Sequence, residues 1–182
     1  MVLSLLFLAA STTASPDATN AQMAQLYEEV CLKAFPDDRA VAALMAARGA
    51  KELSAEEVRV TMVDDPARAW RLAESDTTVW LEFPPYHACS VRWHAPQIGE
   101  LSAYETIAAK YKSANAGFTR LPPMAADRGD IHIHAVAEQR PLAGKGFESL
   151  MVIDQTISNE ERRDAGDTGY VIRFVHQFAP PK

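Results

Sequence analysis

The chain has 182 residues, of which 48% are hydrophobic and 23% are charged. This length and composition exclude a long disordered protein and fit one folded domain with a sizeable core. Acidic residues outnumber basic residues by 24 to 18, and the resulting net charge of −6 excludes a general nucleic-acid surface, because phosphates attract clustered Lys and Arg. We therefore expect the partner to be a protein or a small ligand.

The first 15 residues have the pattern of a secretory signal peptide. An apolar run, Val2–Ala10, precedes the small residues Ser11–Ser15, and cleavage is expected near Ala14. The run is shorter than the roughly 20 apolar residues that a membrane-spanning helix needs. We expect a periplasmic or secreted protein without a membrane span. The alternative is an apolar element that opens the mature fold.

The sequence contains two cysteines, Cys31 and Cys89. In an exported chain this pair is expected to be a disulfide, because thiols oxidise outside the reducing cytosol. A bridge that closes a loop of nearly 60 residues stabilises a fold by about 4 kcal/mol in the chain-entropy treatment. Two buried, unpaired cysteines are the alternative.

The predicted domain, residues 19–182, opens with helical patterns. Apolar residues recur at helical spacing up to Cys31, which therefore faces inward. Ser54 and Glu57 form a capping box, although the residues that follow also alternate as in a strand. Three helices are predicted, at residues 19–35, 37–48 and 54–64.

Beyond Ala67 the apolar period changes from that of a helix to that of a strand. A helix at residues 102–117, with a second capping box at Ser102 and Glu105, separates two groups of three strands. The element order indicates an α+β fold with a largely antiparallel sheet (βββ-α-βββ) and helices packed on one face. The predicted strands are residues 70–73, 77–83, 86–94, 130–138, 147–157 and 169–178.

One strand carries a candidate metal site. Asp130, His132 and His134 alternate with Ile131 and Ile133, so a strand would project the carboxylate and both imidazoles from one face. A divalent metal held there with an open position would activate water and support hydrolysis. Two histidines on a solvated strand face produce the same alternation, and this alternative stays open.

Two other patterns carry weaker chemistry. His87 and Cys89 share a strand face, but a disulfide consumes the thiolate that a Cys–His pair needs, so we expect a core histidine. The segment 144–146 resembles part of a phosphate loop but lacks its outer glycine and its Ser or Thr, so we expect a connecting loop.

Trp80 is a candidate binding residue. Trp80 alternates with Val79 and Leu81 in a predicted strand, so it points away from their face of the sheet. An exposed Trp80 would be an anchor for a partner or a glycan. Packing in the core or at the sheet edge is the interpretation that we favour, since aromatic residues are common in strands for packing reasons.

The segment Val30–Leu32 and the segment Tyr86–Val91, which follows a Pro-Pro turn, each contain one of the cysteines. These two segments resemble a family of small uncharacterised exported proteins of Gram-negative bacteria. The resemblance covers residues 22–93 and implies a periplasmic or secreted address. It implies no activity and assigns no catalytic residues.

Three functions follow from these patterns. The leading hypothesis is a non-enzymatic binding module that holds a protein or a small ligand through its sheet face or loops, because the sequence contains no catalytic signature with the required spacing. The first alternative is a metal-dependent hydrolase that uses Asp130, His132 and His134. The second is an inhibitor or immunity-type protein whose acidic loops bind a basic partner.

Overall fold

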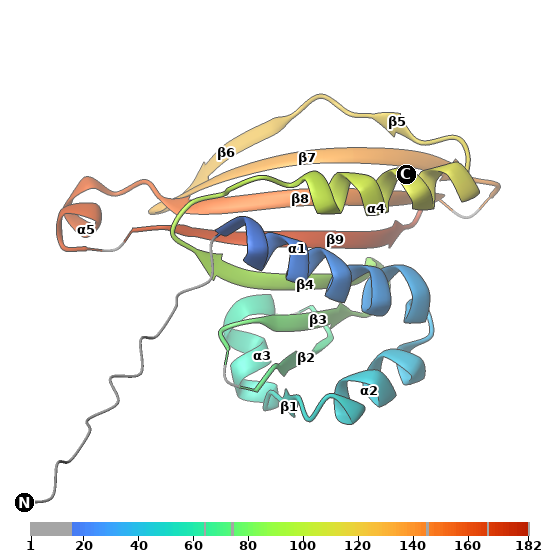
Figure 1. The fold of residues 1–182 in the computed structure, drawn as a ribbon, viewed down its shortest axis with the longest axis horizontal. Coiled ribbons are helices and arrows are strands. Elements are labelled where there is room, and N and C mark those ends of the chain that lie inside the picture. Colours follow the sequence, from blue (N-terminus) through green and yellow to red (C-terminus); the bar gives the residue numbers. More distant parts are fainter. Residues whose placement is uncertain (1–15, 64, 74, 145, 167, 182) are drawn as a thin grey trace, which may run out of the picture.

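An antiparallel sheet of nine strands organises the molecule (Figure 1). This computed structural model describes residues 16–63, 65–73, 75–144, 146–166 and 168–181, so the predicted signal peptide, residues 1–15, lies outside the described residues. The strand order is β1-β2-β3-β4-β9-β8-β7-β5, and β6 also pairs with β7. The strands are β1 (Lys51–Glu52), β2 (Ala67–Arg71), β3 (Thr78–Glu82), β4 (His87–Ala95), β5 (Thr119–Arg120), β6 (Met124–Arg128), β7 (Ile131–Leu142), β8 (Gly146–Ile157) and β9 (Tyr170–Ala179).

The helices lie on both faces of this sheet. In Figure 1, α1 and α4 run side by side in front of the long strands, and α2 lies near the β1 end. Helix α3 instead packs beneath β2 and β3 on the opposite face, where it buries a separate apolar cluster. The helices are α1 (Pro16–Tyr27), the π-helix η1 (Glu28–Ala34), α2 (Asp38–Ala47), α3 (Ala55–Met62), α4 (Ser102–Ala114) and the short α5 (Glu160–Asp164).

The main core lies between the sheet and the helices α1, η1, α2 and α4. Alternate residues of β4 and β9 face these helices, and their register sets Trp93 beside Ile172 and Val91 beside Phe174. The ring of Phe174 stacks on Tyr104 of α4 with centroids 4.4 Å apart. The two-residue period that the sequence shows in these strands therefore produces one continuous apolar layer.

The α+β class and the antiparallel sheet predicted from the sequence are confirmed. The capping box at Ser54 is also confirmed, since the Ser54 hydroxyl accepts from the Glu57 amide at 3.3 Å and the Glu57 carboxylate accepts from the Ser54 amide at 2.8 Å. The capping box at Ser102 is wrong. Ser102 is already the first helical residue, and Leu101 before it makes no side-chain cap.

Candidate functional site

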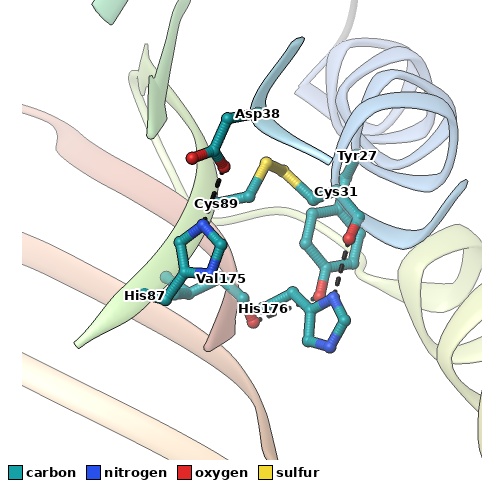
Figure 2. Close-up of a disulfide and its surroundings, with 7 residues drawn as sticks. All are labelled: Tyr27, Cys31, Asp38, His87, Cys89, Val175 and His176. Atoms are coloured by element: carbon teal, nitrogen blue, oxygen red, sulfur yellow. Dashed lines mark hydrogen bonds and ion pairs between the residues drawn. A yellow bond between two sulfur atoms is a disulfide. The ribbon is translucent and has the colours of Figure 1, made fainter. Parts of the chain in front are cut away.

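The predicted disulfide is confirmed and lies inside the fold. Cys31 of η1 and Cys89 of β4 are bonded, with their Cα atoms 5.3 Å apart (Figure 2). Both residues are fully buried. Because both sulfurs are in this bond, neither provides the thiolate that a Cys–His catalytic pair requires.

His87 lies on the same side of β4 as the disulfide, as Figure 2 shows. Its Nε2 is 2.8 Å from the Asp38 Oδ1 at the start of α2, and its ring packs edge-on against Phe35. These contacts tie β4 to the segment between η1 and α2. This geometry favours the interpretation of His87 as a packed histidine.

A second histidine beside the disulfide belongs to a buried polar network. His176 of β9 is paired in register with Cys89, and its Nδ1 donates to the Cys31 carbonyl oxygen at 2.7 Å. Its Nε2 lies 2.8 Å from the Glu148 Oε1. His176 is 1% exposed and Glu148 is 0% exposed. Neither residue stands out in the sequence, because a lone Glu and a lone His carry no spacing signal.

Glu148 accepts hydrogen bonds from several donors at once. The Tyr111 hydroxyl donates to Oε1 at 2.6 Å, and the Arg140 Nε donates to Oε2 at 2.5 Å. Burial alone would raise the pKa of Glu148, but the hydrogen bonds from His176, Tyr111 and Arg140 outweigh it and lower the pKa to about 2. The carboxylate is therefore ionised and closed off from solvent, which fits a structural network better than a reactive centre.

The candidate metal ligands do not converge in the structure. His132 Nδ1 lies 2.7 Å from the Asp127 Oδ1, whereas His134 Nδ1 lies 2.9 Å from the Asp154 Oδ2. Asp130 belongs to neither pair. Its carboxylate lies 3.4 Å from the side-chain nitrogen Nδ2 of Asn159 and 3.9 Å from the Nη1 of Arg162.

The alternation predicted for these residues fails at Asp130, which lies in the turn before β7 rather than in the strand. Each imidazole instead has its own carboxylate from a neighbouring strand. Among the residues that the structure describes, no three His, Cys, Asp or Glu side chains are grouped closely enough to hold a metal ion.

Trp80 is packed, as favoured from the sequence, and is not the exposed anchor that its candidate binding role required. Trp80 does point away from Val79 and Leu81, as predicted, but the face that it joins is covered there by α3. The indole is 4% exposed and packs with Leu53, Val58 and Ala69. Its Nε1 donates to the Thr78 hydroxyl at 2.9 Å. Trp80 thus anchors α3 to the sheet and does not present a free surface.

The strongest candidate site lies beside α3 on the same face of the sheet, which we call the open face. Helix α3 covers this face at β2 and β3. Farther along, a cavity of about 510 Å³ opens between the end of β4 and the segments that flank α5. A second cavity of about 430 Å³ lies between α3 and β4. Arg92 and His94 line both, so the two cavities adjoin, and we call them together the open-face groove.

Arg92 occupies the centre of this open-face groove. Within the described residues the Arg92 guanidinium makes no hydrogen bond or ion pair, and Arg173 of β9 lies directly opposite it in register. Partial burial, followed by the like charge of Arg173, lowers the pKa of the Arg92 guanidinium. Such a group differs from an ordinary surface arginine, which is fully hydrated or paired.

Another cavity lies on the opposite face, under α4. It has a volume of about 270 Å³ and is lined by Tyr104, Val136 and the ion pair between Lys112 and Glu138. Of the two cations that line this smaller cavity, Lys112 is neutralised by Glu138 and Arg120 is exposed to solvent. The open-face groove is larger, and its central cation has no partner in the described structure.

No family model matches this chain, and neither a curated protein nor a solved structure gives a match. The resemblance of the two cysteine segments to exported proteins of Gram-negative bacteria therefore stays a prediction. Among the described helices, none has both the length and the apolar character required to cross a membrane.

Proposed function

We propose that the protein is an exported, non-enzymatic binding module that holds its ligand in the open-face groove. The observation that carries the proposal is the groove itself, whose two cavities of about 510 and 430 Å³ fall within the range of ligand pockets. Ile131, Val171 and Tyr170 supply apolar lining, while Arg92 and His94 supply polar groups. This combination of apolar walls and a few polar groups is typical of sites for small ligands.

The proposed periplasmic or secreted address is supported by the disulfide, because such bonds persist outside the reducing cytosol. A binding role is favoured over catalysis by the state of the other candidate groups. The cysteines are bonded, His176 is enclosed, and the histidines of β7 pair with separate carboxylates. The metal-dependent hydrolase and the inhibitor of a basic partner stay predictions of the sequence, and no contact among the described residues specifically favours them.

The proposal predicts that a small apolar probe binds in the groove. We expect 1-hexanol, titrated into ¹⁵N-labelled protein, to shift the amide resonances of Ile131, Gln155 and Val171 in a saturable manner. Changing Ile131, which is 37% exposed, to Gln should weaken this binding about fivefold, because apolar contact with the probe is lost.

Met124→Gln is the matched control, since Met124 is also an exposed apolar residue, at 57%, but does not line the groove. This variant should bind 1-hexanol like the wild type. Shifts confined to the cavity under α4, or shifts that never saturate, would contradict the proposed site.

A further inference from the structure

We infer that the ligand of the open-face groove carries an anionic group, a carboxylate or a phosphate, which Arg92 binds with Arg173 beside it. This inference rests on the proposed function and specifies the class of ligand. Its first support is that Arg92 is a partly buried cation without an acidic partner in the described residues. Desolvating a cation is unfavourable unless an anion compensates it.

The second support is the pairing of like charges across two strands. Arg92 and Arg173 face each other in the register of β4 and β9, and directly opposed like charges destabilise a sheet. Arg173 Nη2 lies 3.4 Å from the Glu82 Oε1, and both of these side chains are 19% exposed. Glu82 thus compensates Arg173, whereas no carboxylate of the described residues is paired with Arg92. A bound anion would neutralise the charge that remains.

The third support is the presence of unpaired hydrogen-bond donors around this pair. The Arg173 Nε and the Ser90 hydroxyl are buried and have no hydrogen-bond partner within the described structure. Ser90 lies two residues before Arg92 and so on the same face of β4. Most buried polar groups in proteins are paired. These two groups line neither cavity, but they show that the polar groups beside Arg92 are incompletely paired within the described structure.

The distribution of charge along the groove places the anion at its β9 end. Glu57 and Asp76 line the cavity next to α3. In the cavity next to β9, Arg92 is the cation without an acidic partner among the described residues, Arg162 has Asp130 at 3.9 Å, and no carboxylate is among the described lining residues. Such a cationic cavity in a chain with a net charge of −6 is a local departure from the overall charge, and it favours an anionic ligand.

Arginine also determines the geometry of recognition. Its planar guanidinium donates two parallel hydrogen bonds to a carboxylate or to a phosphate, whereas a lysine contributes a point charge. The apolar side chains of Ile131 and Val171 line the same cavity. The ligand that fits is therefore a small organic anion with an apolar body.

The test compares three probes that share a six-carbon chain: hexanoate, hexyl phosphate and 1-hexanol. Dissociation constants are measured by NMR titration at low salt. We expect the wild type to bind at least one of the two anions about tenfold more tightly than the alcohol. In Arg92→Gln this preference should disappear, while the affinity for 1-hexanol stays unchanged. Tighter binding of hexyl phosphate identifies a phosphate ligand, and tighter binding of hexanoate identifies a carboxylate.

Arg39→Gln is the matched control, because it removes the same charge from an exposed position on α2 and should keep the preference. If Arg92→Gln does not fold, Arg92→Lys replaces it, and we expect the preference to fall several-fold because the fork of donors is lost. Equal binding of all three probes to the wild type would overturn the inference. A preference for the anions that is unchanged in the Arg92 variant would also overturn it. Absence of saturable binding by all three would instead refute the proposed function.

Discussion

Removing the Cys31–Cys89 disulfide is expected to lower the free energy of unfolding by about 4 kcal/mol. The bond joins positions 58 residues apart, so its loss releases a long loop in the unfolded chain. In the folded state it fixes η1 to β4 within the main core. The measurement is urea unfolding of the double variant Cys31→Ala, Cys89→Ala beside the wild type.

Dithiothreitol supplies the control for this prediction. The wild type, reduced while unfolded and then refolded with the reductant present, should match the double variant, whereas the double variant itself should not respond to reductant. If oxidised and reduced wild type unfold at the same urea concentration, the bond contributes nothing measurable to stability, and the loop-closure argument fails.

Local sequence signals predicted the fold well where one residue period extends over a whole element. In β4, Cys89, Val91 and Trp93 alternate with polar residues, and all three lie in the main core. The strands that sequence patterning missed are β1, β5 and β6. Strands β1 and β5 have only two residues each, and every residue of the three strands is exposed. Burial therefore imposes no alternation that a sequence could reveal.

The position of α3 shows a second limit. Periodicity correctly predicted that Trp80 points away from Leu81 but carries no information on which helix covers that face. The capping box at Ser54 predicts where α3 begins, yet packing against the sheet is decided by contacts between distant parts of the chain. The expectation that the helices pack on one face thus holds for α1, η1, α2 and α4 but fails for α3, which lies on the other face.

The candidate site depends almost entirely on strand register. Arg92 and Arg173 are 81 residues apart in the sequence, and only the pairing of β4 with β9 sets them opposite each other. The same is true of His134 and Asp154, which the pairing of β7 with β8 brings together. A single sequence shows the faces of each strand but not its neighbours, so these pairs were beyond prediction.

Replacing Glu148 with Gln is expected to destabilise the protein by about 3 to 5 kcal/mol at pH 7, the usual effect of breaking a buried ion pair. Gln keeps the shape of the side chain but turns an ionised acceptor into a neutral group with two N–H donors. These donors would meet the N–H and O–H groups of Arg140, Tyr111 and His176. Urea unfolding at pH 7 measures the loss.

The pH dependence provides an independent test of the same network. The pKa of Glu148 falls from an ordinary value of 4.5 to about 2 on folding, so its ionised form stabilises the native state above pH 4.5. This stabilisation, about 3 kcal/mol, is lost as the pH falls from 4.5 toward 2. The difference in stability between wild type and Glu148→Gln should therefore shrink over that interval.

Tyr111→Phe tests the network if Glu148→Gln does not fold. It removes one donor to the carboxylate, should cost about 2 kcal/mol, and should weaken the loss of stability in acid because the pKa of Glu148 is then lowered less. Tyr86→Phe, at a tyrosine that is 54% exposed, controls for loss of a hydroxyl. A stability difference between wild type and Glu148→Gln that stays constant from pH 7 to pH 2 would mean that the ionised carboxylate does not hold β8, β9 and α4 together.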